Sequence, residues 1–215
     1  MDKYNDIAIF GAGDFGQEVS FLLSSITELS RKRFIGYYDD NIPKGAECKN
    51  GIVLGNLENL KCVKSTLGLI IAVGNPNTLF SIKNKITGDN FVFPNVISPS
   101  TYLLESRIFK IGIGNIFLGG SFISYDVEIG NFNIFNTGVN LGHHAKVGDF
   151  NILSPNVQVS GKSFIGDLNF FGLNSAILPM KGVGDRNRIS AGSIVSKKFG
   201  NASFLSGNPA LTLNI

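Results

Sequence analysis

The adjacent residues His143 and His144 supply the two imidazoles of this 215-residue chain. A neutral imidazole near pH 7 can accept a proton from an attacking amine or hydroxyl, so a general base is the first chemistry to consider. Metal ligation would need more partners, and adjacent histidines point apart, so we expect no metal site. The alternative is that both histidines simply face solvent.

A second candidate site begins with the motif Gly11-Ala12-Gly13-Asp14-Phe15-Gly16. The motif follows the apolar run 7–10 and precedes a helical stretch over 17–25, which is the setting of a phosphate-binding glycine loop. Glycines allow a tight turn there, and the N–H groups at the start of a helix favour phosphate. A plain tight turn would explain the motif equally well, so both interpretations stay open.

Polar residues also follow the next two predicted strands. Asp39-Asp40 ends a strand over 34–38, where a carboxylate could bind ribose hydroxyls, and Gly74-Asn75 ends a strand over 69–73. Open α/β sheets place ligands at such strand ends, although a simple turn explains Gly74-Asn75 equally well. The alternation of strand and helix predicts a small α/β, Rossmann-like domain over 1–94. Its length is too short for a complete NAD-binding domain, which argues against hydride transfer.

From residue 95 on, the sequence repeats every six residues. Large apolar side chains occupy every sixth position from Ile111 to Val195, and the position after each is mostly Gly or Ser. This period is typical of a β-helix, in which each hexad forms a short strand and a turn. The apolar side chain should point inward and the small residue should let the backbone bend, so that stacked coils bury one apolar column. We predict a β-helix over 95–198 and a C-terminal cap or tail over 199–215.

The six-residue frame also places the histidines. Leu141 and Val147 should point inward, and His143 and His144 come two and three residues after Leu141. They therefore fall at a bend or at the start of the next face, outside the core. This position favours a role in chemistry over the packing role of a buried histidine.

Composition limits the partners and the compartment. The net charge of +3 is mildly basic, and no Lys/Arg stripe is present, so we expect anionic small molecules and no nucleic acid. The two cysteines, Cys48 and Cys62, suggest no disulfide framework and are compatible with a reducing compartment. The first apolar run is too early and too short for a signal peptide, and no 18-residue apolar stretch occurs. These features predict a cytoplasmic protein without a membrane span.

Several short motifs occur in a specific order and spacing along nearly the whole chain: Ile9-Phe10-Gly11-Ala12-Gly13, Asp39-Asp40, Ile71-Ala72-Val73-Gly74-Asn75, Asn136-Thr137, Gly142-His143, Gly172-Leu173-Asn174-Ser175 with Leu178-Pro179, and Gly207-Asn208-Pro209-Ala210. Together with the two predicted domains, they resemble the bacterial sugar acyltransferases of the sialic-acid O-acetyltransferase type. This hexapeptide-repeat family includes the nucleotide-linked 4-amino-sugar N-acetyltransferases of glycan and O-antigen pathways.

The resemblance implies a left-handed parallel β-helix and a homotrimer whose active sites lie between subunits. It implies that acetyl-CoA lies between neighbouring β-helices and contacts, largely through the backbone, Gly161, Leu173, Ala191 and Gly192. It implies that the N-terminal domain holds the nucleotide of a nucleotide sugar through Gly11, Gly13, Asp39, Asp40 and Asn75. His143 corresponds to the general base, with His144 beside it as a candidate to share that role or to orient the base.

The chain departs from the family pattern at three positions. Many similar proteins carry Asp or Glu directly after the base, where this chain has His144. Similar proteins often carry a His in the glycine loop, where this chain has Phe15, and another one coil-step later, where it has Ile152. The acid that would orient the imidazole is thus absent from its usual place.

The resulting hypothesis is an acetyl-CoA-dependent N-acetyltransferase that acts on the amino group of a nucleotide-linked amino sugar of the 4-amino-4,6-dideoxy type. The amine would attack the thioester directly, because neither Cys48 nor Cys62 lies near His143 in sequence or domain. Two alternatives stay open: O-acetylation of a sugar hydroxyl, as on sialic acid, and an inactive scaffold that keeps the fold.

Overall fold

The computed structural model describes residues 4–104 and 110–213. The backbone divides into two compact units. The first comprises Met1–Gly74 and Thr78–Val96, and the second comprises Asn75–Asn77 and Ile97–Ile215. Each unit is described below by itself.

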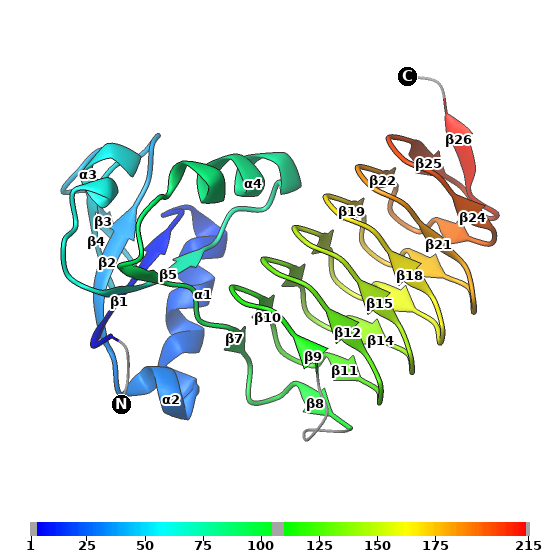
Figure 1. Ribbon diagram of the computed structural model, residues 1–215, viewed down its shortest axis with the longest axis horizontal. Coiled ribbons are helices and arrows are strands. Elements are labelled where there is room, and N and C mark those ends of the chain that lie inside the picture. Colours follow the sequence, from blue (N-terminus) through cyan, green and yellow to red (C-terminus); the bar gives the residue numbers. More distant parts are fainter. Residues whose placement is uncertain (1–3, 105–109, 214–215) are drawn as a thin grey trace. The chain divides into compact units, whose positions relative to one another are not determined.

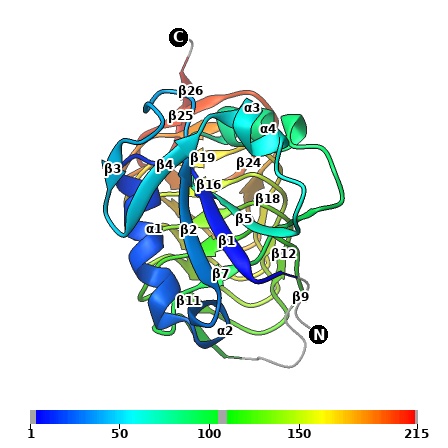
Figure 2. The ribbon, with the colours of Figure 1, turned by 90° about the vertical axis from the view of Figure 1, so that its left-hand side faces the viewer.

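The first unit is built on one sheet whose strands lie in the order β3-β4-β2-β1-β5-β6 (Figures 1 and 2). Its strands are β1 (Asp6–Phe10), β2 (Arg33–Tyr38), β3 (Glu47–Cys48), β4 (Gly51–Gly55), β5 (Leu67–Ile71) and β6 (Phe91–Val92). The central strand β1 runs parallel to both β2 and β5, and only β3 pairs antiparallel. Every residue of β5 is buried, as expected for a strand inside a parallel sheet.

Helices connect these strands. They are α1 (Asp14–Ser25), α2 (Thr27–Ser30), α3 (Leu57–Lys61) and α4 (Pro76–Lys85). The α/β alternation predicted from the sequence is present, and the third predicted strand lies two residues earlier, at β5. The strands β3, β4 and β6 and the helix α3 were not predicted, because each is short and β4 carries only one buried large apolar side chain, Val53.

The second unit is a parallel β-helix whose chain passes in turn through three sheets (Figure 1). We name each sheet by its first strand. The β7 sheet contains β7 (Val96–Ile97), β10 (Ile116–Phe117), β13 (Ile134–Phe135), β16 (Ile152–Leu153), β19 (Phe170–Phe171), β22 (Arg188–Ile189), β25 (Phe204–Ser206) and β26 (Leu211–Leu213). The β8 sheet contains β8 (Tyr102–Leu103), β11 (Phe122–Ile123), β14 (Asn140–Leu141), β17 (Gln158–Val159), β20 (Ala176–Ile177) and β23 (Ile194–Val195). The β9 sheet contains β9 (Lys110–Ile111), β12 (Glu128–Ile129), β15 (Lys146–Val147), β18 (Phe164–Ile165), β21 (Gly182–Val183) and β24 (Lys198–Phe199).

Most residues of this β-helix stack on the residue 18 positions further along the chain. Phe117 pairs with Phe135, for example, and their rings stack with centroids 4.3 Å apart. The predicted six-residue series is buried from Phe117 to Val195, and Ile111 packs against it at the edge. The apolar column expected from the repeat is therefore present.

The small residue of each hexad was expected to let the backbone bend. In the structure it instead lets neighbouring coils stack closely. The left-handed backbone falls two residues later, as at Asp126, His144 and Lys162, which have φ of 53°, 58° and 58°. A Cβ at Gly142 would lie 2.6 Å from the backbone nitrogen of Gly161 in the next coil. The small side chain is thus required because the coils approach each other closely at this point.

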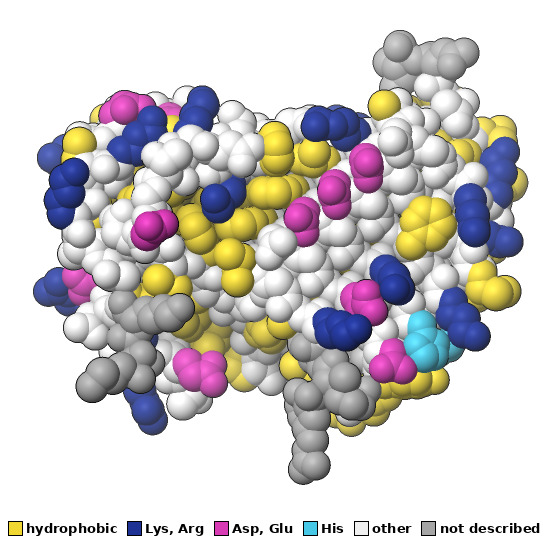
Figure 3. Space-filling model, in the orientation of Figure 1, with side chains coloured by type: hydrophobic (Ala, Val, Ile, Leu, Met, Phe, Trp, Pro, Cys, Tyr) yellow, Lys and Arg dark blue, Asp and Glu magenta, His cyan; other side chains and the backbone are white. Residues whose placement is uncertain are grey.

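Between the sheets the chain turns at three corners. The asparagine corner (112–115, 130–133, 148–151, 166–169 and 184–187) links the β9 sheet to the next strand of the β7 sheet. Its buried amides form a ladder: Asn115, Asn133, Asn151, Asn169 and Asn187. From Asn133 on, each Nδ2 donates to the Oδ1 of the asparagine one coil earlier, at 3.0–3.1 Å. On the same corner, carboxylates of Asp149, Asp167 and Asp185 accept backbone N–H groups of the preceding coil. In Figure 3 acidic side chains form a row across the β-helix.

The C-terminal residues close the β-helix. Strand β25 continues the parallel stacking on β22, and β26 then turns back antiparallel to β25. Leu205 and Ala210 are buried there and complete the apolar column.

Candidate active site

The predicted base lies on a corner that we call the histidine corner (124–127, 142–145, 160–163 and 178–181), between the β8 sheet and the β9 sheet. Tyr125, His143 and Gly161 occupy the same place in three successive coils. The ring of His143 stacks on that of Tyr125, with centroids 5.6 Å apart and planes at 16°. On the other side, a Cβ at Gly161 would lie 2.6 Å from Cε1 and Nε2 of His143. The exposed imidazole is therefore held between a phenol ring and bare backbone.

His144 lies beside this stack with its ring turned nearly perpendicular to that of His143, at 88°. Its Nδ1 is 3.3 Å from Oδ2 of Asp126, which stands one coil earlier. Its backbone N–H donates to the carbonyl of Tyr125 at 3.1 Å. An acid thus lies one coil before the two histidines, but its contact is with His144 and not with the predicted base, His143.

Charged side chains of the β9 sheet lie next to the pair formed by His144 and Asp126. Glu128 accepts a hydrogen bond from Lys110 and forms an ion pair with Lys146, both at 3.3 Å, and these contacts hold the pKa of Glu128 below its usual value. A pocket of about 300 Å³ is lined by Lys110, Asp126, Val127, Glu128, His144 and Lys146. In Figure 3 histidine side chains, in cyan, lie beside acidic and basic side chains on this part of the surface. Within residues 4–104 and 110–213, no group of three or more His, Cys, Asp or Glu could hold a metal ion.

The four residues expected to contact acetyl-CoA lie on two corners. Gly161 belongs to the histidine corner, whereas the other three belong to the leucine corner (118–121, 136–139, 154–157, 172–175 and 190–193), between the β7 and β8 sheets: Leu173, Ala191 and Gly192. Within the described residues, the N–H groups of Gly161, Leu173 and Ala191 have no acceptor, whereas that of Gly192 donates to the carbonyl of Leu173 at 2.9 Å. Backbone N–H groups without a partner among the described residues thus occur on both corners.

The glycine loop of the first unit is tightly constrained. Gly11 has φ of 108°, and a Cβ there would lie 2.5 Å from the carbonyl oxygen of Ala72. A Cβ at Gly16 would overlap the carbonyl of Gly11, so α1 can start this close to β1 only with glycine. Gly13 is the N-cap of α1, has no side-chain cap, and faces open space where a Cβ would be. The start of α1 is thus accessible to an anionic group.

The two neighbouring aspartates have different partners. Asp39 Oδ2 accepts the N–H of Ala12 at 2.8 Å, and its Oδ1 accepts the N–H groups of Asn41 and Ile42. This carboxylate therefore fixes the glycine loop from the end of β2. It also helps to raise the pKa of the nearby Cys48 thiol, although burial of the thiol contributes more.

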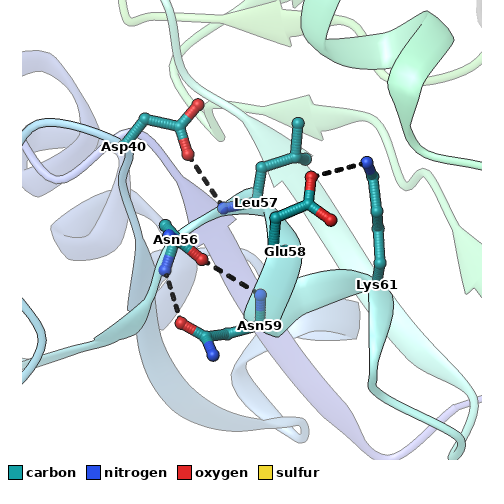
Figure 4. Close-up of polar contacts among 6 residues, drawn as sticks. All are labelled: Asp40, Asn56, Leu57, Glu58, Asn59 and Lys61. Carbon is teal, nitrogen blue, oxygen red and sulfur yellow. Dashed lines mark hydrogen bonds and ion pairs between the residues drawn. The ribbon is translucent and has the colours of Figure 1, made fainter.

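Asp40 instead supports the start of α3 (Figure 4). Its Oδ1 accepts the N–H of Leu57 at 2.8 Å, beside the capping box of Asn56 and Asn59. A shallow pocket of about 220 Å³ runs along this edge and is lined by Asp39, Asp40, Asn41, Ile42, Pro43, Lys44, Gly55, Asn56 and Asn59. The predicted contact Asn75 is exposed after the end of β5. The structure thus brings Gly11, Gly13 and Asp39 together.

Sequence reasoning missed Tyr125 and Asp126. The signal that could have found them is the 18-residue stacking period, because 125 and 126 lie one coil before 143 and 144. The six-residue series predicts which side chains point inward. Contacts between side chains of successive coils instead follow a period of 18 residues, which is three hexads, and this period also governs the polar positions.

Comparison with known proteins adds a family assignment for the first unit. Residues 6–86 match the family model described as the PglD N-terminal domain. The match covers the α/β part of the chain, which is therefore similar to this domain. A search of curated proteins finds no match.

Solved structures match nearly the whole chain, the α/β unit and the β-helix together. A mutant of perosamine N-acetyltransferase from Caulobacter crescentus, in complex with CoA and GDP-perosamine, has a TM-score of 0.86 at 21% identity and covers 98% of this chain and 97% of its own. The acetyltransferase domain of PglB from Neisseria gonorrhoeae FA1090 has a TM-score of 0.88 at 22% identity, with 98% and 100% covered. WeeI from Acinetobacter baumannii AYE has a TM-score of 0.80 at 23% identity, with 96% and 99% covered.

These matches establish the fold. A small α/β Rossmann-like domain, similar to the PglD N-terminal domain, is followed by a left-handed parallel β-helix of hexapeptide repeats. The predicted fold class is confirmed, and so is the resemblance to sugar acetyltransferases of this architecture. Among the described helices, none has the length and apolar character needed to cross a membrane.

Proposed function

We propose that this protein is an acetyl-CoA-dependent N-acetyltransferase that acts on the amino group of a nucleotide-linked amino sugar of the 4-amino-4,6-dideoxy type. The observation that carries the proposal is the geometry of His143. Its imidazole is exposed at a corner of the β-helix and fixed between the Tyr125 ring and the Gly161 backbone. A base in this position can reach a bound substrate without losing its orientation.

In this mechanism, the sugar amine attacks the carbonyl carbon of the acetyl thioester, and the new C–N bond forms as negative charge develops on the carbonyl oxygen. His143 accepts the proton that the amine loses. Collapse of the tetrahedral intermediate breaks the C–S bond, and the leaving CoA thiolate takes the proton from His143. The amide and CoA are the products, and no residue of the enzyme is acylated.

Unpaired backbone donors support binding of the acyl donor. The N–H groups of Gly161, Leu173 and Ala191 have no acceptor among the described residues. Such fixed donors stabilise a developing oxyanion or hold the amide groups of an extended ligand. Gly161 is the donor next to His143, so it is the candidate for the oxyanion contact.

The glycine loop supports binding of the nucleotide part. The uncapped start of α1 offers N–H groups to a diphosphate, and Asp39 holds the loop in shape through Ala12. We assign Gly11, Gly13 and Asp39 to this nucleotide site. Asp40, which supports the start of α3, and Asn75, which belongs to the second unit, stay predictions from the family resemblance. The solved perosamine N-acetyltransferase with a similar fold is in complex with GDP-perosamine, a nucleotide-linked sugar of the proposed class.

The division of the donors between two corners supports a homotrimer. In one chain, Gly161 and Ala191 lie on different edges of the β-helix. When copies of a three-sided prism pack side by side around a threefold axis, one corner of each copy comes beside another corner of its neighbour. A single acetyl-CoA could then contact both sets of donors. Light scattering after gel filtration tests this state, and a monomer at micromolar concentration would contradict it.

The decisive experiment is CoA release. Purified protein and acetyl-CoA are mixed with UDP-, dTDP- and GDP-linked 4-amino sugars and with free and CMP-linked sialic acid, and free thiol is measured. The His143→Ala variant runs beside the wild type, with Gln158→Ala, an exposed residue of the β8 sheet, as the matched control.

The outcomes separate the alternatives. Thiol release with an amino sugar, lost in His143→Ala and kept in Gln158→Ala, supports the proposal and names the nucleotide. Release only with sialic acid moves the assignment to O-acetylation. Silence with every acceptor, together with no thermal shift on adding acetyl-CoA, indicates an inactive scaffold.

A further inference from the structure

We propose that Tyr125 is a positioning residue for His143: its ring, delivered by the preceding coil, fixes the imidazole plane during proton transfer. The effect of Tyr125 on catalysis rests on the proposed function. That Tyr125 holds the His143 ring is argued from the structure of the histidine corner alone.

The first observation is the confinement of His143 along the stacking direction. The Tyr125 ring lies below it at 5.6 Å between centroids and at 16° between planes. The Gly161 backbone lies above it, so close that a Cβ would come within 2.6 Å of two ring atoms. Ring pairs at this separation attract each other beyond the effect of buried area. The imidazole therefore has a support on each face.

The second observation is a third ring at the side. His144 meets Tyr125 at 78° and His143 at 88°, with centroids 5.2 Å and 5.3 Å away. Asp126 holds His144 in turn through the contact of Oδ2 with Nδ1 at 3.3 Å. Because Tyr125 and Asp126 are neighbours on one coil and His143 and His144 are neighbours on the next, the four side chains form one interlocked group.

The stack also has a chemical consequence. On accepting a proton, His143 becomes a cation, and an aromatic face within about 6 Å of a cation attracts it. Tyr125 therefore both orients the neutral base and supports its charged form. This arrangement replaces the orienting acid, because the residue after the base is His144 and its carboxylate partner, Asp126, contacts His144 rather than His143.

The test compares Tyr125→Leu, which removes the ring, with Tyr125→Phe, which keeps it. Tyr102→Leu is the matched control, since Tyr102 is an exposed tyrosine of the same β-helix and stacks on Phe122 with centroids 5.6 Å apart. Two readouts are taken on each full-length variant. One is kcat and KM for CoA release, and the other is the NMR shift of the imidazole ring protons.

The NMR readout is simple because the chain has two histidines, and His144→Ala assigns the pair. We expect the His143 ring protons to carry an upfield ring-current shift that Tyr125→Leu loses and Tyr125→Phe keeps. We expect kcat to fall about 10-fold in Tyr125→Leu with KM within about twofold, since a fixed ring contributes to proton transfer and not to acceptor binding. Tyr125→Phe and Tyr102→Leu should stay within about twofold of the wild type in kcat.

The proposal would be wrong if Tyr125→Leu left the NMR shifts of the His143 ring protons unchanged. It would also be wrong if Tyr125→Leu moved those shifts but left kcat unchanged. Equal losses of kcat in Tyr125→Leu and Tyr125→Phe would overturn it as well. If the wild type releases no CoA with any acceptor, the proposed function fails instead. The ring-proton shifts then still decide whether Tyr125 holds His143.

Discussion

The imidazole of His143 occupies the space that a side chain at Gly161 would need, because a Cβ at residue 161 would lie 2.6 Å from both Cε1 and Nε2 of the histidine. The His143 ring can therefore take this position only because residue 161 has no side chain. Gly161 thus has two parts in the proposed site: it leaves room for the His143 ring, and it carries a backbone N–H that has no acceptor among the described residues.

Gly161→Ala should displace His143. Residue 161 is not among those with positive φ, so alanine fits the backbone, and the added methyl group must instead move the ring. We expect kcat to fall by about 10- to 100-fold, since misplacement of a catalytic group by about 1 Å costs on that order. Gly200→Ala, whose Cβ would meet nothing within 4 Å, is the control. Activity equal to the wild type in Gly161→Ala would show that the ring position is unimportant.

His143→Ala should lower kcat by about 10²- to 10⁴-fold, the usual contribution of a general base. His144→Ala should cost less, because His144 lies beside the stack and its Nδ1 is engaged with Asp126. Steady-state CoA release on the best acceptor measures both. An unchanged kcat in His143→Ala would refute the assignment of the base, and equal losses would mean that the two histidines share the role.

Asp39→Asn should weaken nucleotide binding without slowing the chemical step. The carboxylate accepts three backbone N–H groups, from Ala12, Asn41 and Ile42, and an amide has one oxygen fewer to offer. We expect KM for the nucleotide sugar to rise about 10-fold with kcat nearly unchanged, as for a loss of uniform binding. Asp6→Asn, which removes an exposed ion pair with Arg33, is the control. An unchanged KM in Asp39→Asn would show that the glycine loop does not bind the nucleotide sugar.

Asn151→Ala should destabilise the β-helix more than any exposed change nearby. The buried Asn151 amide donates to Asn133 Oδ1 and to the carbonyl of Gly166, and its Oδ1 accepts from Asn169. Truncation leaves buried partners unpaired, so we expect a loss of about 2–4 kcal/mol in the free energy of unfolding, measured in urea. Asn140→Ala, which removes an exposed contact with Gln158, should cost less than about 0.5 kcal/mol. Equal losses would mean that the ladder adds nothing.

The two cysteines should react at different rates. Burial and then the charge of Asp39 raise the pKa of Cys48, so a smaller fraction of it is thiolate at pH 8, whereas Cys62 is exposed. Iodoacetamide at pH 8 should therefore modify Cys62 first, as followed by peptide mass spectrometry. Asp39→Asn should speed the reaction of Cys48, and faster labelling of Cys48 than of Cys62 in the wild type would contradict this account.

The parts of the fold that a short period governs were predictable from the sequence. The six-residue series identified the β-helix and placed Leu141 and Val147 inward, and with them His143 and His144 at a bend. The small strands β3 and β6 were missed, because two residues carry no periodicity. The role of Gly142 was misassigned for a related reason: its contact is with Gly161, in the next coil, and nothing local marks that approach.

The site itself was predictable only in part. His143 was proposed from its residue type, and Gly11 and Gly13 from their motif, and their roles stay predictions. Tyr125 and Asp126 were not found, because neither residue type is unusual and their partners lie 18 positions away. Asp39 and Asp40 were assigned to one site because they are adjacent in the sequence. The Asp40 carboxylate, however, accepts the N–H of Leu57, whereas that of Asp39 accepts the N–H of Ala12.

The 18-residue register has a consequence for how this protein can change over time. Residues that share a functional contact here sit at i and i+18, so selection acts on pairs that are distant in the gene and adjacent in the coil. A substitution at 125 alters the demands on 143, and one at 143 alters those on 161. Insertion of one residue between 125 and 143 would break every i and i+18 pair that spans the insertion, whereas duplication of a whole coil beyond residue 181 would leave the pairs 125/143 and 143/161 intact. Point substitutions coupled at this interval, and length changes in whole coils, are therefore the routes by which the proposed site can diverge while it keeps the stacked position of His143.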